Sequence, residues 1–327
     1  MSLSPHTRKK VAVLMGGWSR ERAISLETGR CVYDGLCRLG HDVVALDVAD
    51  RGAIGKIVAL AQDGTECIFN ALHGRWGEDG CVQGILECMG VPYTHSGVCA
   101  SSLAMDKYVA QRFFMQEGLV CPPMKRCYRH QCLVGDEPFP RPYVIKPINE
   151  GSSVGVFVVR EDKDVEDMRS FGALDDLILV QEFILGRELS VGVMGGKALG
   201  VIEIVHRRGF YDYRAKYDEG GSQHVMPAPI GKDMYGRAMH LSEQAYRCLG
   251  CRGIARVDWR LQESSNHLYM LEVNTQPGMT RHSLFPEIAA YEGIDFESLL
   301  TWSIAHATLD ATAADGGAVE REEGQAC

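Results

Sequence analysis

LEVNTQPGMT, residues 271–280, places a carboxylate, a carboxamide and a Pro-Gly turn directly after an apolar run that is typical of a β-strand. Alternate side chains of a strand share a face, so we expect Glu272 and Asn274 to point into the same site. Their hard oxygen donors suit magnesium. The segment therefore predicts a strand that contributes ligands to a magnesium site.

A second strand is predicted upstream, at residues 254–261 (IARVDWRL), and the polar residues 263–267 (ESSNH) fit a hairpin loop between the two. This pairing would bring Asp258 beside Glu272, and Arg256 would face the same site. Two carboxylates and an amide on adjacent strands suit magnesium ions that also bind substrate phosphates. A neighbouring arginine can stabilise the negative charge that develops in phosphoryl or acyl-phosphate chemistry.

The composition is that of an ordinary globular protein with room for two or three domains: 327 residues, 46% of them hydrophobic and 24% charged. The net charge of -9 and the pI near 5.7 argue against nonspecific nucleic-acid binding, which needs clustered Lys and Arg. Twelve cysteines are scattered along a chain without a hydrophobic signal segment, so we expect reduced thiols in the cytoplasm. No apolar run approaches the roughly 18 residues of a membrane helix.

The order of the predicted elements indicates a mixed architecture, α/β at the N-terminus and α+β beyond it. Apolar runs at 10–15, 42–48 and 67–72 alternate with a helical pattern at 21–39, which predicts a Rossmann-like domain with a parallel sheet. A helix at 99–116 is followed by strands at 143–147, 157–160 and 178–184, and then by a hairpin at 189–204 and helices at 283–291 and 296–308. We therefore predict domains at 1–98, 99–184 and 185–309, with a disordered tail at 310–327.

Several polar segments could bind an anionic ligand. The loop EGSSVG at 150–155 has small residues that let backbone N–H groups approach a phosphate, although alone it could equally be a flexible hairpin turn. Lys146 ends the strand before this loop, and Lys107 is a second cation near a domain edge. The GxxxxGK[ST] loop and a GxGxxG fingerprint after the first strand are both absent, so nucleotide binding would need another architecture.

Three further segments allow two readings each. Glu21, in GGWSRERAIS (16–25), begins a helix and could either cap it or bind a ligand amine. His73, in LHGRWGEDG (72–80), follows a strand at the edge where open α/β sheets bind ligands, and could contact a ligand or organise its loop. The aromatic segment FYDYRAKY (210–217) could close over a substrate or be an irregular exposed loop.

Taken together and in this order, these segments resemble the D-alanine-D-alanine ligases of the ATP-grasp superfamily. The resemblance covers residues 10–308 and rests on GGWSRERAIS, HGRWGEDG, MDK, EGSSVG, YDYRAKY and LEVNTQPGMT with the following HSL. It implies an ATP-grasp fold of three domains. It also implies an enzyme that phosphorylates the carboxylate of one D-alanine and lets the amine of a second displace phosphate, which supplies a dipeptide for peptidoglycan. Phosphorylation is needed because hydroxide is a poor leaving group, and an excluded pocket protects the intermediate from water.

The resemblance assigns the nucleotide and metal contacts residue by residue. Asp258, Glu272 and Asn274 would hold two magnesium ions, which manganese can replace, and a monovalent cation requirement stays open. The phosphates of ATP would be held by Lys107, Lys146, Lys216 and the backbone of Ser152 and Ser153. Adenine and ribose would be read by Gln181, Glu182, the main chain of Ile184, and Glu188. Many relatives carry an acidic residue at the position of Gln181, but an amide oxygen can also accept from the exocyclic amine.

The same resemblance assigns the amino-acid contacts. Glu21 would pair with the ammonium of the first D-alanine, with His73 close by. Arg256 and the Gly278 amide would form the oxyanion hole, and Ser283 and Leu284, at a helix N-terminus, would hold the second substrate. By the same resemblance, Tyr217 would be hydrogen-bonded with Glu21 and Ser152 and would favour the dipeptide product over D-alanyl-D-lactate, whose ligases carry phenylalanine there.

Two other functions stay open at this point. A related ligase could accept D-lactate or D-serine second, and a catalytically silent ATP-grasp module could bind nucleotide only. The resemblance also implies a homodimer whose partners are small molecules, with no nucleic acid and no membrane.

Overall fold

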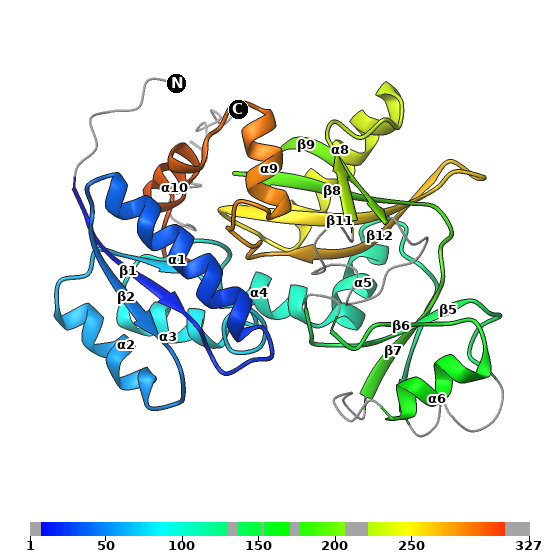
Figure 1. Ribbon diagram of the computed structural model, residues 1–327, viewed down its shortest axis with the longest axis horizontal. Coiled ribbons are helices and arrows are strands. Elements are labelled where there is room, and N and C mark those ends of the chain that lie inside the picture. The colour runs from blue at the N-terminus through cyan, green and yellow to red at the C-terminus, as the bar shows by residue number, and fades with distance from the viewer. Residues whose placement is uncertain (1–7, 130–136, 152–153, 171–176, 207–221, 311–327) are drawn as a thin grey trace, which may run out of the picture.

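The computed structural model describes residues 8–129, 137–151, 154–170, 177–206 and 222–310. Its N-terminal sheet is parallel, as predicted, with the order β2-β1-β3 and the strands β1 (Lys10–Met15), β2 (Asp42–Asp47) and β3 (Cys67–Asn70). The helices α1 (Arg22–Arg38), α2 (Ala53–Gln62) and α3 (Cys81–Met89) surround it (Figure 1). The central strand β1 is an apolar run because both of its faces are covered, and Val11 through Leu14 are fully buried.

A four-stranded antiparallel sheet follows, at the lower right of Figure 1. It is reached through α4 (Val98–Met105) and α5 (Lys107–Gln116), and Asp106 begins α5 by accepting a hydrogen bond from the backbone N–H of Val109. The strands β4 (Met124–Tyr128), β5 (Tyr143–Pro147), β6 (Phe157–Val159) and β7 (Leu177–Glu182) lie in the order β4-β7-β5-β6, with α6 (Asp162–Ser170) between β6 and β7 in the chain. Pairing of β5 with β6 places the glycine-serine loop at the end of this sheet, as predicted.

The third sheet has five antiparallel strands in the order β10-β9-β8-β11-β12. They are β8 (Arg187–Met194), β9 (Lys197–His206), β10 (Ser222–Val225), β11 (Ile254–Gln262) and β12 (His267–Asn274). The helix α8 (Lys232–Cys248) packs on it, and the indole of the fully buried Trp259 donates to the Ser242 hydroxyl at 2.8 Å. The helix α9 (Leu284–Tyr291) contacts β8 and β9.

The predicted hairpin is confirmed in its register. On β11 and β12, Asp258 stands opposite Glu272 and Arg256 stands opposite Asn274. The register shifts after Asp258, since Trp259 pairs with Met270, so Leu271 is an extra residue that has no partner position on β11.

The end of the described chain returns to the N-terminal sheet. The helix α10 (Phe296–Ala305) packs against α1 and β3, and one apolar core joins side chains of both regions. Nine of the described cysteines are free thiols, as expected, but Cys127 in β4 is disulfide-bonded, which the expectation of reduced thiols missed. Among the described residues, no helix is long and apolar enough to span a membrane.

Candidate active site

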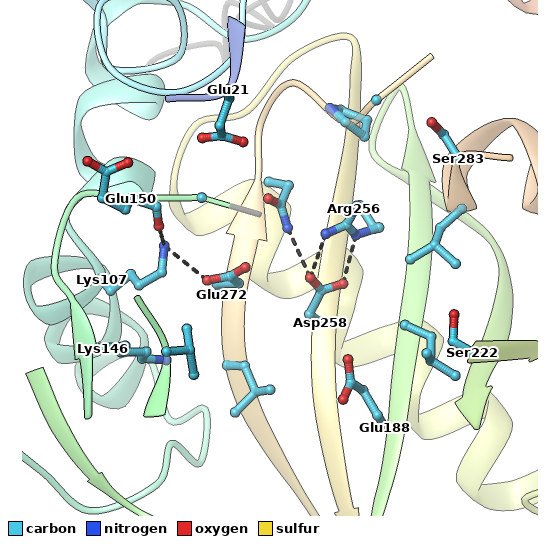
Figure 2. Close-up of a pocket in the computed structure, with 18 of the residues that line it drawn as sticks. Glu21, Lys107, Lys146, Glu150, Glu188, Ser222, Arg256, Asp258, Glu272 and Ser283 are labelled. Carbon is cyan, nitrogen blue, oxygen red and sulfur yellow. Dashed lines mark hydrogen bonds and ion pairs between the residues drawn. The ribbon is translucent and has the colours of Figure 1, made fainter. Parts of the chain in front are cut away.

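A cavity of about 1200 Å³ lies where the three sheets meet, and every predicted site residue of the described part lines it. These residues are Glu21, His73, Lys107, Lys146, Gln181, Glu182, Ile184, Glu188, Arg256, Asp258, Glu272, Asn274, Gly278, Ser283 and Leu284. Figure 2 shows the labelled lining residues around one space, from the predicted Glu21 at one end to the predicted Glu188 and a further lining residue, Ser222, at the other. Ser152, Ser153, Lys216 and Tyr217 lie outside the described residues.

Asp258 accepts four hydrogen bonds from three neighbouring side chains. The Arg256 guanidinium donates to it through Nε and Nη2 at 2.9 and 2.8 Å, a bidentate arrangement two residues away on the same strand face. Asn274 donates its amide nitrogen at 3.0 Å, and the Ser190 hydroxyl donates at 2.5 Å from β8. These partners fix the carboxylate, while Nη1 of Arg256 lies on the edge of the guanidinium away from Asp258.

Glu272 lies in a cluster of positive charge. Lys107 Nζ is 3.1 Å from Glu272 Oε2 and also donates to the carbonyl of Glu150 at 2.8 Å (Figure 2). Burial alone would raise the pKa of Glu272, but the charges of Lys107 and Lys146 outweigh it and lower the pKa to about 2. Burial lowers the pKa of Lys146 to about 8, with Glu272 opposing the change and Lys107 adding to it. Glu272 is therefore ionised at neutral pH.

The donor set fits a hard divalent cation. Asp258 and Glu272 occupy paired positions of adjacent strands, and the low pKa of Glu272 keeps its carboxylate charged. Because Asn274 gives its amide nitrogen to Asp258, its carboxamide oxygen points away from that bond. No cluster of three or more His, Cys, Asp or Glu suited to a metal occurs in the described part of the chain, so an all-protein cage is absent there. Two carboxylates and an amide oxygen match an ion that keeps substrate phosphates as its other ligands.

The two readings of Glu21 are separated by the geometry of α1. Glu21 precedes the first residue of the helix, but its side chain makes no capping hydrogen bond. It is 4% exposed and lines the cavity, with its carboxylate against two backbones from other segments. A Cβ on Gly74 would lie 2.8 Å from Glu21 Oε1, and a Cβ on Gly151 would lie 2.7 Å from the same atom. This position is that of a ligand-facing carboxylate.

His73 serves its loop as well as the cavity. Its Nδ1 is 2.7 Å from Glu78 Oε1, and its Nε2 is 3.1 Å from the hydroxyl of Thr28 on α1. Burial alone would lower the pKa of His73, but the hydrogen bond to Glu78 and the negative charges of Glu78 and Glu21 raise it above the ordinary value. The His73 side chain therefore does both things that the sequence allowed: it organises its loop, and it faces the pocket where a ligand would bind.

At the other end of the cavity, polar and apolar groups suitable for a nucleoside lie around the end of β7. Gln181 is 2% exposed on this strand, Glu182 follows it, and the buried Ile184 comes just beyond the strand end. Glu188 on β8 has an oxygen 3.4 Å from the Arg260 guanidinium. The chain segment that leads from β7 in one sheet to β8 in another therefore faces this end of the pocket with both its side chains and its backbone.

Ser283 precedes α9 and lies at the opposite side of the cavity from Lys107 (Figure 2). Its hydroxyl accepts from the Thr280 backbone N–H at 3.1 Å, and it makes no capping bond to its own helix. A Cβ on Gly278 would lie 2.9 Å from this hydroxyl, so the glycine allows the loop to pass close to it. Leu284 begins the helix and is 8% exposed. The N-terminus of α9 and a hydroxyl together suit a carboxylate.

Gln276 is a site residue that the sequence reasoning missed. Its Oε1 accepts from the Asn70 amide at 2.8 Å, and its Nε2 donates to the carbonyl of Leu72. Gln276 lies within residues 271–280, but nothing in its spacing indicates a partner 206 residues away. Ser190 was also missed. A signal existed for Glu78, the partner of His73, because both belong to the same motif.

Two family models and several curated proteins match this chain. Residues 126–305 match the family model "D-ala D-ala ligase C-terminus", and residues 55–96 match "D-ala D-ala ligase N-terminus". The chain is 48% identical over 306 residues to a D-alanine–D-alanine ligase of Paramagnetospirillum magneticum, covering 92% of this chain and 99% of that one. A relative of the same name from Rhodospirillum rubrum is 48% identical over 304 residues, covering 93% and 99%.

Solved structures give the same result. The fold is similar to a crystal structure of D-alanine–D-alanine ligase from Bacillus anthracis complexed with ATP, with a TM-score of 0.77 and 28% identity over 95% of this chain and 100% of that one. A second structure of that enzyme has a TM-score of 0.79 and 30% identity over 94% and 100%. The predicted ATP-grasp architecture is confirmed. The chain belongs to the D-alanine–D-alanine ligase family.

Proposed function

We propose that this enzyme uses ATP to join two D-alanine molecules into D-alanyl-D-alanine, a precursor of peptidoglycan. The observation that carries the proposal is the single cavity lined by all the described candidate residues. At its centre, Asp258 and Glu272 face each other across a hairpin beside two lysines, and Glu21 and Ser283 lie toward its edges. An amine site, a phosphate site and a carboxylate site thus open into one space.

The nucleotide roles follow from charge and position. Lys107 and Lys146 would bind the phosphates, and Gln181, Glu182, the main chain of Ile184, and Glu188 would read adenine and ribose. Asp258, Glu272 and Asn274 would hold two magnesium ions, or manganese in their place. When bound, such ions offset the negative charge of the phosphates. The low pKa of Glu272 supports this role, since the carboxylate is charged before any ligand arrives.

The first bond is made on the carboxylate of the first D-alanine. Glu21, with His73 beside it, would hold the ammonium group of this substrate, which leaves its carboxylate near the phosphate site. A carboxylate oxygen attacks the γ-phosphorus, ADP leaves, and an acyl phosphate forms. The cavity, once filled by both substrates and ATP, would exclude water, which otherwise hydrolyses that intermediate.

The second bond joins the two amino acids. The amine of the second D-alanine, held through its carboxylate by Ser283, Leu284 and the α9 N-terminus, attacks the acyl carbon after losing a proton. Arg256 and the Gly278 amide would stabilise the negative oxygen of the tetrahedral intermediate, and phosphate then leaves. The contact of Gly278 with Ser283 supports this arrangement, since the oxyanion donor and the carboxylate anchor are neighbours.

Further assignments rest on the family resemblance. We place Ser152 and Ser153 over the phosphates, Lys216 at the γ-phosphate and Tyr217 beside Glu21 as the residue that favours the dipeptide. We also propose domains at 1–98, 99–184 and 185–309, a disordered tail at 310–327, and a cytoplasmic location for the enzyme.

A homodimer is also proposed. On α2, Ile54 and Val58 are 38% and 41% exposed one turn apart, and sedimentation velocity would show whether two copies associate.

The test is to incubate the protein with ATP, magnesium and D-alanine and to identify the products by mass. Dipeptide, ADP and phosphate in equal amounts are expected, with no product when magnesium is chelated. D-lactate and D-serine are offered in parallel as the second nucleophile. Preference for D-lactate at neutral pH would overturn the dipeptide assignment, and nucleotide binding without any product would identify a silent module.

A further inference from the structure

Two buried glutamines connect the sheet that carries the metal ligands with the strand that carries Gln181. Gln111 on α5 is fully buried, and its Nε2 donates to the carbonyl oxygen of Leu271 at 2.6 Å. Gln181 Nε2 then donates to Gln111 Oε1 at 2.5 Å. Gln181 lines the cavity, whereas Gln111 does not, so Gln111 acts from behind it.

The direction of this chain of hydrogen bonds is set by its first acceptor. A backbone carbonyl can only accept, so Gln111 must direct its NH₂ group to Leu271 and its oxygen to Gln181. Gln181 must then direct its own NH₂ group to Gln111, so the oxygen of the Gln181 amide lies on the side away from Gln111. Burial of both side chains makes the reversed arrangement costly, because two acceptors would face each other.

The β-bulge explains why Leu271 accepts from Gln111. The register of β11 and β12 skips Leu271, and the carbonyl of this residue accepts from Gln111 instead. Gln111 lies one helical turn after Lys107, which contacts Glu272, so successive turns of α5 bind successive residues of β12. Figure 1 shows α5 between the sheet that contains β12 and the sheet that contains β7.

We propose that Gln111 is a positioning residue for base selection: it fixes the Gln181 amide with its oxygen toward the nucleotide, so that the site prefers a 6-aminopurine to a 6-oxopurine. This inference rests on the proposed placement of adenine at Gln181. The exocyclic amine of adenine donates to the fixed oxygen. A 6-oxo group would instead place two acceptors together, which costs a site more than a merely missing contact.

The test measures binding of ATP and of inosine triphosphate by calorimetry, and ligation with both nucleotides. We expect the wild type to bind ATP about tenfold or more tightly than inosine triphosphate. This is the difference in affinity that one correctly paired buried hydrogen-bonding group makes. Gln111→Leu removes both hydrogen bonds and lets the Gln181 amide turn over, so the preference should fall toward one. Gln244→Leu is the control, because Gln244 also donates to a main-chain carbonyl, that of Glu117, but at the exposed surface.

A reversal of polarity gives the sharper result. In Gln111→Lys the new side chain has donors only, so Gln181 must present its oxygen to the lysine and its NH₂ group to the base, and inosine triphosphate should bind better than ATP. The double variant Gln111→Lys/Gln181→Glu should restore the ATP preference, since a carboxylate accepts on both sides. Thermal melting checks that each variant is folded. If Gln111→Lys does not fold, the nucleotide preference of Gln111→Leu decides the question.

The proposal is wrong if the wild type does not discriminate the two nucleotides, or if folded Gln111→Leu and Gln111→Lys keep the wild-type ratio. Failure of the proposed function would look different. In that case ATP would still bind selectively to the wild type, but no dipeptide would form.

Discussion

Replacing Glu272 by glutamine changes one atom and one charge at the centre of the site. In the folded protein, Lys107 and Lys146 lower the pKa of this carboxyl from its ordinary value of 4.5 to about 2, which corresponds to about 3 kcal/mol. A lowered acid pKa stabilises the fold above the unfolded-state pKa, and this contribution is lost as the pH falls from 4.5 toward 2. With metal chelated at pH 7, Glu272→Gln should therefore reduce the free energy of unfolding by about 3 kcal/mol, and the difference from wild type should shrink in acid.

The same substitution should also reduce turnover. The amide offers a neutral oxygen where the site needs a charged one, so we expect a loss of several kcal/mol of transition-state stabilisation, or roughly 10³-fold in kcat. Urea unfolding gives the first quantity, and phosphate release with a magnesium titration gives the second. Glu263→Gln is the matched control, because Glu263 lies in the turn of the same hairpin with a 68% exposed side chain. Near-wild-type phosphate release by Glu272→Gln would refute the metal assignment.

The remaining predictions concern substrate choice, loop packing and pH. Tyr217→Phe should leave ATP use intact and raise activity with D-lactate, measured by product mass; an unchanged product ratio would remove Tyr217 as the selector. Gly278→Ala should place a methyl group against the Ser283 hydroxyl and raise KM for the second D-alanine, whereas Gly236→Ala, with open space around its Cβ position, should not; equal kinetics would contradict the close contact. The raised pKa of His73 stabilises the fold below the unfolded pKa near 6.5 and is lost as the pH rises through the folded pKa, so His73→Gln should cost more stability at pH 6 than at pH 9 in paired melting curves. Parallel curves would contradict the ion pair with Glu78.

The hairpin was predictable because its information is local. Along β11, residues from Ala255 onward alternate between buried and partly buried, and this period of two fixes which side chains share a face with Asp258. The polar break at 263–267 then predicts the hairpin that brings Asp258 beside Glu272, and the skipped Leu271 places the two directly opposite each other. The same reasoning found β5 and β6 around the glycine-serine loop.

The contacts that depend on how the sheets meet were not predictable in this way. A strand pattern predicts faces, but it does not predict which loop reaches which strand end. The bond from Asn70 to Gln276 joins the N-terminal sheet to the segment after β12, and the bond from Gln181 to Gln111 joins β7 to α5. Glutamine also has no periodicity of its own that would separate a buried relay from a surface residue. The skipped position at Leu271 is equally invisible, because an apolar residue in an apolar run carries no sign of a bulge.

The two readings of Glu21 show how tertiary contacts decide a role that sequence leaves open. A carboxylate before a helix suits a cap and a ligand contact equally, so local pattern is neutral. The decision comes from the start of the glycine-serine loop, where Gly151 lies against the Glu21 carboxylate while the carbonyl of the preceding Glu150 holds Lys107, the partner of Glu272. Two consecutive backbone units therefore touch the proposed ammonium site and the proposed phosphate site. We expect a displacement of these two backbone units to move both sites, which would give the enzyme a physical route to align the first D-alanine with ATP before the carboxylate attacks.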